Sequence, residues 1–260
     1  MGARRLVEDM IHKLKDRDSL ILVGSVMGLG LILWLMALPL ATLPAPIGPA
    51  AAQFSAGALT TIELTLWASV FGLVLGILAA LGKRSHIPPA RWVADLYVWV
   101  IRGTPLLLQI LFFFLAVPAI APQLQLSEFW TAVIALSLNV GAYNAEVIRA
   151  GINAVPTGQV EAARSLGLSL VYTFWDIVLP QAVRISLPPL ANNMVALLKD
   201  SSLAYAIGVV ELSMVSSRVQ AESFQPVPVF MTVAAIYLLL TTTFTQFAAA
   251  LERKLAVGKR

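Results

Sequence analysis

The sequence predicts an all-α integral membrane protein with six transmembrane helices, from its composition, its long apolar runs and the distribution of basic residues. Of its 260 residues, 58% are hydrophobic and only 12% are charged. Soluble domains carry about 25% charged residues, so this composition is typical of a chain embedded in a bilayer. The net charge of +4 is no sign of nucleic-acid binding, because the basic residues flank apolar runs, where they determine topology.

The residue types exclude several kinds of chemistry. The chain has no cysteine, so it has no disulfide, thiolate metal site or cysteine nucleophile. Its two histidines, His12 and His86, are far apart in sequence and lie among basic residues. We therefore expect no metal site, no catalytic residue and no cofactor in this chain.

Apolar runs long enough to cross a bilayer recur along the chain. A hydrocarbon core of about 30 Å needs about 20 apolar residues in a helix. Five runs meet this length, at residues 19–40, 54–81, 92–118, 128–151 and 227–250. A sixth, residues 184–208, contains a proline pair, an asparagine pair and a lysine–aspartate pair. It can cross only if these groups face protein or water.

Loop charge predicts the orientation of these spans. Basic residues occur before the first span, between the second and third, around residues 149–184 and at the C-terminus, whereas residues 39–53 and 119–127 contain no Lys or Arg. The positive-inside rule then places both termini and residues 153–182 on the cytoplasmic side of a multi-pass membrane protein. Six spans satisfy this alternation and five do not, with Arg218 as the one exception.

The segment EAARSLGLSLVYTFWDIVLP, residues 161–180, reads as two short helices between spans. Thr157 is a candidate N-cap for the first helix, Gly167 a left-handed residue that ends it, and Ser169 the N-cap of the second. The second helix has an apolar face and is expected to stop at Pro180. The pattern fits either an interfacial helix pair on lipid headgroups or a docking site for another protein. The residues of the apolar face are Val171, Phe174, Trp175 and Val178.

The spacing within this segment resembles the coupling-loop motif of ATP-binding-cassette importer membrane subunits. The motif is E-A-A, three residues, G, nine residues, I, one residue, L-P. Further stretches resemble the branch that transports polar amino acids such as histidine, glutamine, glutamate, arginine and opines: ALTTIELT, RGTPLLLQ, GAYNAEVIRAGI, GQVEAARSLG and LPPLANNMVALLKDSSL. The motif positions in this chain are Glu161, Ala162, Ala163, Gly167, Ile177, Leu179 and Pro180.

This resemblance implies a domain organisation and a set of partners. Residues 51–260 would form the permease domain, with a five-helix core and the coupling loop at 153–182. Residues 1–50 would add a cytoplasmic N-terminus, an extra first helix and an outer loop. The motif positions would dock one of two ATPase subunits, which carry ATP and Mg. An extracytoplasmic solute-binding protein would deliver the amino acid to the complex in the bacterial inner membrane. A second permease subunit, identical or different, would complete the path.

Charged residues within the predicted spans need partners, because an ionisable group in the membrane costs about 2.5–3.5 kcal/mol. Glu146 and Arg149 are three residues apart on one helix, which favours a structural ion pair. Arg102 lies beside Gly103 and Pro105, which can kink the helix. It is either a snorkelling anchor or a partner for Glu63 or Glu146.

The stretch NNMVALLKDSS contains the candidate substrate contacts. Lys199 could bind the carboxylate of a zwitterionic amino acid and Asp200 its ammonium group, with Asn192 and Asn193 donating or accepting hydrogen bonds along the path. The alternative is that Lys199 and Asp200 pair with other charges or with the companion subunit.

Two other functions remain open from the residues alone. A secondary transporter would also place charges in mid-membrane, but it would usually contain inverted repeats, and the two halves of this chain show no convincing repeat. A scaffolding subunit would use residues 161–180 only as an interaction surface. The chain contains no P-loop pattern G-x-x-x-x-G-K-[ST], so it is not expected to be an enzyme and any ATP hydrolysis belongs to a partner.

Overall fold

The computed structural model describes residues 23–24, 27–28, 30–31 and 35–256 of the chain. The predicted first span, residues 19–40, lies partly outside the described residues, and the basic residues that precede it lie wholly outside them. In the described part of the chain, every regular element is helical, which agrees with the predicted all-α class.

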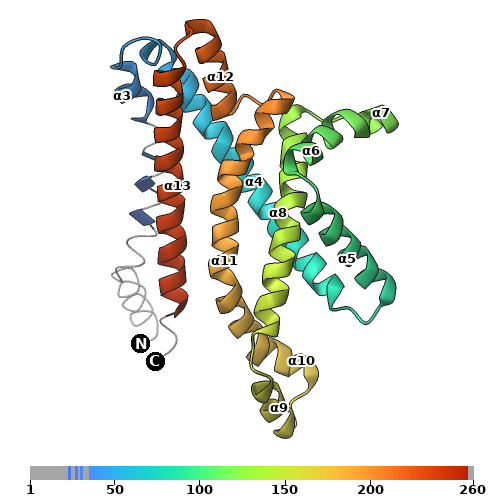
Figure 1. Ribbon diagram of the computed structural model, residues 1–260. Coiled ribbons are helices and arrows are strands. Elements are labelled where there is room, and N and C mark those ends of the chain that lie inside the picture. Colours follow the sequence, from blue (N-terminus) through green and yellow to red (C-terminus); the bar gives the residue numbers. More distant parts are fainter. Residues whose placement is uncertain (1–22, 25–26, 29, 32–34, 257–260) are drawn as a thin grey trace, which may run out of the picture.

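The helices run between two ends of the molecule (Figure 1). At the upper end of the figure lie α3, α12 and the 3₁₀ helix η5, and at the lower end lie α9 and α10. Helices α8 and α11 run from the upper end down to α9 and α10, whereas α4 and α13 begin at the upper end and stop short of them. Helix α5 returns from the end of α4. The bounds are α3 Ala37–Ala41, η1 Gly48–Ala50, α4 Ala51–Lys83, α5 Pro88–Gly103, α6 Leu106–Leu111, η2 Phe112–Ala116, α7 Val117–Ile120, η3 Pro122–Leu124, α8 Glu128–Asn153, α9 Thr157–Ser165, α10 Leu170–Tyr172, η4 Thr173–Val178, α11 Leu179–Asp200, η5 Ser201–Ile207, α12 Leu212–Ser223 and α13 Pro226–Ala256.

Three described helical segments are long and apolar enough to cross a membrane: Gly48–Lys83, Glu128–Asn153 and Pro226–Ala250. They coincide with three of the predicted spans. The bent pair of α5 with α6 and α7 makes a fourth if the two arms count as one span. Helix α11 is 22 residues long but is not among the sufficiently apolar segments, so the sixth predicted span remains a prediction.

The predicted span at residues 92–118 is not one continuous helix. The segments Pro88–Gly103 and Leu106–Ile120 meet at 111°. Thr104 is extended, with φ −121° and ψ 147°, and Pro105 follows with ψ 136°. Proline disfavours the helical conformation in the residue before it and donates no backbone hydrogen bond, so the predicted kink is a full break.

Among the described residues, the most extensive helix contact joins α4 to α8 through small residues. Gly72 and Gly76 form a GxxxG pattern on α4, and Gly141 of α8 lies opposite. A Cβ built on Gly76 would be 2.6 Å from Cβ of Asn144 and 3.2 Å from the carbonyl oxygen of Gly141. Glycine therefore lets the two backbones approach, as at packed interfaces of membrane helices. This contact fixes α8, which carries much of the candidate site.

Gly76→Ala is expected to lower the free energy of unfolding by about 1–3 kcal/mol, because the new methyl group has no space between α4 and α8. The matched control is Gly158→Ala in α9, where a Cβ would meet nothing within 4 Å. That variant should be neutral or gain about 0.5–1 kcal/mol from helix propensity. Thermal unfolding of the purified protein measures both, and equal effects would contradict the close-packing argument.

Candidate functional site

The segment around Glu161 forms a helix, a glycine turn and a second helix, as predicted. Helix α9 begins at Thr157 itself and Pro156 occupies the N-cap position, so the expected capping role of Thr157 is wrong. Gly167 has φ +81°, and the backbone N–H of Leu168 donates to the carbonyl oxygen of Ala163 at 3.1 Å. This left-handed glycine ends the helix. Ser169 caps the next helix, since its Oγ accepts from the N–H of Tyr172 at 3.4 Å.

The second helix of the segment does not stop at Pro180, which corrects the prediction. Helix α10, a π-helical turn over Thr173–Val178 and α11 follow one another directly, with Pro180 in the first turn of α11. The π turn shifts the hydrogen-bond register just before Pro180. In an uninterrupted α-helix, Pro180 would remove one backbone hydrogen bond, and its ring would clash with a carbonyl group of the preceding turn. The same turn breaks the predicted apolar face, so Val171 and Trp175 are exposed.

The π turn anchors the segment on the ends of α8 and α11. Phe174 and Val178 pack in one apolar cluster with Ile152, Val155 and Ala182. The side chain of Gln181 also donates to that of Gln159 across the segment, at 2.5 Å. The segment is therefore held to the helices by side-chain contacts as well as by the chain itself.

The motif residues differ in exposure. Glu161, Ala162 and Gly167 are exposed, and Ile177 and Leu179 are half-buried. Ala163 is only 3% exposed, so it packs against its own chain. Leu166, which the sequence analysis did not single out, is 83% exposed at the tip of the glycine turn.

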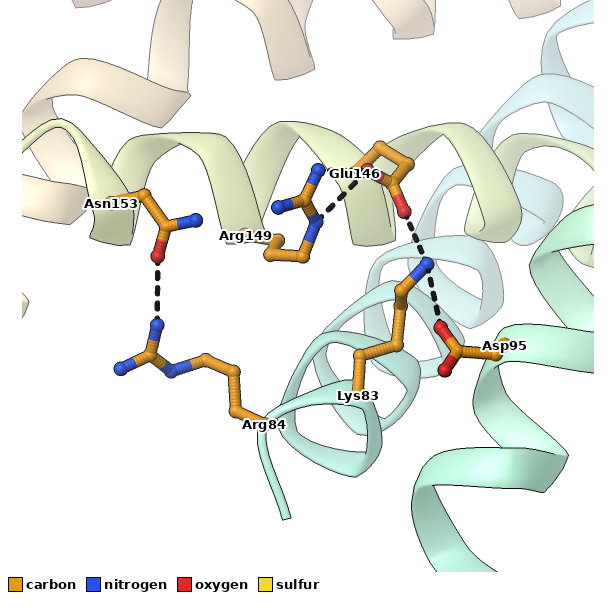
Figure 2. A network of polar contacts seen from close by, with 6 residues as sticks. All are labelled: Lys83, Arg84, Asp95, Glu146, Arg149 and Asn153. Atoms are coloured by element: carbon orange, nitrogen blue, oxygen red, sulfur yellow. Dashed lines mark hydrogen bonds and ion pairs between the residues drawn. The ribbon is translucent and has the colours of Figure 1, made fainter.

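A network of charged side chains joins α4, α5 and α8 beside this segment (Figure 2). Lys83 Nζ lies 2.6 Å from Glu146 Oε1 and 3.0 Å from Asp95 Oδ1. Glu146 Oε2 accepts from Arg149 Nη2 at 2.6 Å, which confirms the predicted structural pair. Lys83 was not foreseen, because it and Glu146 are 63 residues apart in sequence.

A further hydrogen bond extends this contact to the end of α8. Arg84 Nη1 donates to Oδ1 of Asn153 at 2.8 Å. Asn153 is the last residue of α8, directly before the segment described above. The ends of α4 and α8 are thus tied together at the point where the chain leaves α8 for α9.

A polar cavity of about 380 Å³ lies between the α5–α6 break, α8 and α11. This is within the usual range of ligand pockets, about 300–1,000 Å³. Asp200 is half-buried on its wall, and Asn193 lies seven residues earlier on the same face of α11. Asn193 Nδ2 donates to Asn144 Oδ1 on α8 at 2.9 Å. The other polar side chains of the wall are Thr104, Asn139 and Tyr143.

The remaining candidate residues lie outside this cavity. Asn192 and Lys199 are exposed, seven residues apart on α11, and neither lines the cavity. Glu63 is exposed on α4. In the described part of the chain no ion pair joins Arg102 to Glu63 or Glu146; instead its guanidinium lies 5.2 Å from the ring centroid of Tyr143. Tyr143 also lines the polar cavity, so Arg102 and the cavity share one aromatic wall.

Glu211, at the start of α12, is a buried carboxyl group that sequence reasoning did not find. Its Oε1 accepts from the N–H of Met214 at 2.8 Å, and Tyr237 donates to its Oε2 at 3.1 Å. Burial raises the pKa of Glu211, while these hydrogen bonds act in the opposite direction. The contact fixes α12 on α13. Among the described residues, no group of three His, Asp or Glu side chains could hold a metal ion.

Comparisons with known proteins identify the family. Residues 72–257 match the model of the binding-protein-dependent transport system inner membrane component. The L-cystine transport system permease protein TcyB of Bacillus subtilis is 41% identical over 202 residues, 77% of this chain and 86% of the relative. The chain belongs to this family. It is therefore a permease subunit of an ATP-binding-cassette importer and not a catalytic subunit, which decides against the secondary transporter.

Two further proteins extend the comparison. The arginine transport system permease protein ArtQ of Bacillus subtilis is 37% identical over 199 residues, 76% of this chain and 90% of the relative. A crystal structure of an amino acid ABC transporter with histidines has a TM-score of 0.75 at 36% identity, covering 79% of this chain and 95% of the other. The fold of the described chain is thus that of an amino-acid importer permease.

Glu146→Gln is expected to lower the free energy of unfolding by about 1–2 kcal/mol. Breaking an exposed ion pair costs little stability and breaking a buried one costs much more. The Glu146 side chain is 19% exposed, so the expected loss lies between these two cases. Asp95→Asn, at a side chain that is 52% exposed, provides the control and should change it by at most about 0.5 kcal/mol. Chemical or thermal unfolding compares the two variants. If Asp95→Asn lowered the free energy of unfolding more than Glu146→Gln does, Glu146 would not be the centre of the network.

Proposed function

We propose that this permease subunit forms a translocation path for a polar amino acid, and that the polar cavity between α5, α8 and α11 is part of that path. The observation that carries the proposal is the half-buried carboxyl of Asp200 on the wall of a cavity among membrane helices. Ionisable groups in such places are costly and serve ion or substrate pathways. The cavity size suits a small ligand.

The relatives support an amino acid as the substrate. Their names and titles give L-cystine, arginine and histidines as what they transport or contain. These compounds differ in side-chain charge but share an α-ammonium and an α-carboxylate group. A site common to such a group of proteins would recognise these shared groups, and the separate binding protein would select the side chain.

The charges around the cavity support a division of roles. Asp200 would accept from the ammonium group, with Asn193 beside it on the same face. Neither Lys199 nor Arg102 lines the cavity. Arg102 lies against Tyr143, which does line it, so the carboxylate of the substrate would point toward this side of the cavity. Asn192 and Lys199 would instead face the second permease subunit, which would shield them from lipid.

The exposed segment of α9 to η4 would dock the ATPase. Glu161, Ala162, Gly167 and Leu166 are accessible there, whereas Ala163 supports the turn from inside. Ile177, Leu179 and Pro180 would connect the docking turn to α11. Two ATPase subunits holding ATP and Mg would move these segments, and an extracytoplasmic binding protein would supply the amino acid on the other side of the bacterial inner membrane. Both termini would lie in the cytoplasm.

Glu161→Lys is expected to reduce ATPase co-purification about tenfold or more, because it reverses the charge of an exposed docking residue, and tenfold corresponds to about 1.4 kcal/mol. The control is Glu222→Lys on α12, an equally exposed glutamate at the other end of the molecule. It should leave co-purification unchanged. Wild-type amounts of ATPase with Glu161→Lys would contradict the docking assignment.

Asp200→Asn is expected to weaken amino-acid binding to the purified permease–ATPase complex about tenfold or more, because the amide cannot neutralise an ammonium group. Radiolabelled L-cystine, L-arginine and L-histidine serve as probes. Lys199→Met, at the adjacent residue on the exposed face, is the control and should keep the wild-type affinity. If Asp200→Asn also keeps it, Asp200 does not contact the substrate.

A further inference from the structure

Gln109 is a buried amide, only 6% exposed, one turn after the break between α5 and α6. Its Nε2 donates to the carbonyl oxygen of Ile101 at 2.8 Å and lies 3.1 Å from that of Thr104. It also lies 2.9 Å from Thr104 Oγ1, which itself donates to the carbonyl oxygen of Val100. The side chain thus satisfies backbone groups that the broken helix leaves without partners.

These partners determine which way the Gln109 amide points. The carbonyl oxygens of Ile101 and Thr104 can only accept, so the NH₂ group of Gln109 must face them. Its Oε1 then faces the opposite side, where it accepts from Asn139 Nδ2 of α8 at 3.0 Å. The orientation of Asn139 follows in turn, because only its NH₂ group can donate to that oxygen.

Asn139 lines the polar cavity together with Asp200. Its Nδ2 donates one of its two hydrogens to Gln109, and among the described residues its Oδ1 accepts no hydrogen bond. This oxygen is therefore an acceptor available to a ligand of the cavity. The cavity wall therefore combines a carboxylate with a fixed amide oxygen, and both are acceptors. An ammonium group, which only donates, matches this pair.

We propose that Gln109 is a positioning residue for substrate recognition. It orients Asn139 so that Oδ1 of Asn139 and the carboxylate of Asp200 together accept from the α-ammonium group of the amino acid. This inference rests on the proposed function, since it assigns the residues that arrange the same cavity. The chain of hydrogen bonds from Asn139 through Gln109 to Thr104 also links the cavity wall to the break at Pro105.

The test is a double-mutant cycle on amino-acid affinity, measured with the purified permease–ATPase complex in the absence of the binding protein. The probes are L-cystine, L-arginine and L-histidine, each tested separately. Gln109→Met and Asn139→Ala should each weaken binding about tenfold or more. The double variant should bind no more weakly than Asn139→Ala alone, because Gln109 acts on the ligand through Asn139.

Additive losses in the cycle, or normal affinity in Gln109→Met, would overturn the inference, because Gln109 would then serve the helix break alone. Gln125→Met, at an exposed glutamine after η3, is the control and should bind normally. Asn139→Ala leaves the contacts of Gln109 with α5 intact. Normal affinity in that variant therefore overturns the inference even if Gln109→Met does not fold.

Failure of the proposed function gives a different result. A wild-type complex that binds none of the three amino acids would overturn the assignment of the cavity as a substrate site, and this inference with it. A wild-type complex that binds one of them, while the variants bind equally well, overturns only the role of Gln109.

Discussion

The close contact between α4 and α8 is the constraint on which the other contacts of the site depend. Gly72 and Gly76 allow the two backbones to approach so closely that a Cβ atom on either glycine would clash with α8. At this separation Lys83 at the end of α4 reaches Glu146 on α8, and Arg84 reaches Asn153. A wider spacing would lengthen these contacts beyond hydrogen-bond distance. The glycines at the α4–α8 contact thus place the charged network near the end of α8 and the start of α9.

Two helices connect the segment of α9, α10 and the π turn with the polar cavity. Helix α11 begins directly after the π turn and ends at Asp200, 22 residues later, which corresponds to about 33 Å. Helix α8 ends at Asn153, next to the same segment, and carries Asn139 and Asn144. The Asn193–Asn144 hydrogen bond joins the two helices near the cavity. Helix α8 contains no proline between Asn139 and Asn153, whereas Pro188 and Pro189 lie inside α11. A displacement of residues 157–178 would therefore be carried to the cavity most directly by α8.

Much of this arrangement follows from the sequence, and the exceptions have physical reasons. Length and apolarity predicted α4, α8 and α13, and capping predicted Gly167 and Ser169, since these depend on local residues. The break at Pro105 was expected only as a kink, and Pro180 was expected to end a helix that a π turn instead carries through. The roles of Lys83 and Gln109 depend on helices far apart in sequence, which no local pattern reveals.

The exposed polar residues of α11 indicate that the described chain is part of a larger assembly. Asn192 and Lys199 lie on one face of this helix and Asn193 and Asp200 on another, seven residues apart in each case. The second pair is satisfied within the chain or faces a cavity. The first pair would face lipid in an isolated subunit, where a lysine costs about 2.5–3.5 kcal/mol. Under the proposed function, a second permease subunit against this face would remove that cost. Helix α11 would then have one face toward the path and one toward that neighbour.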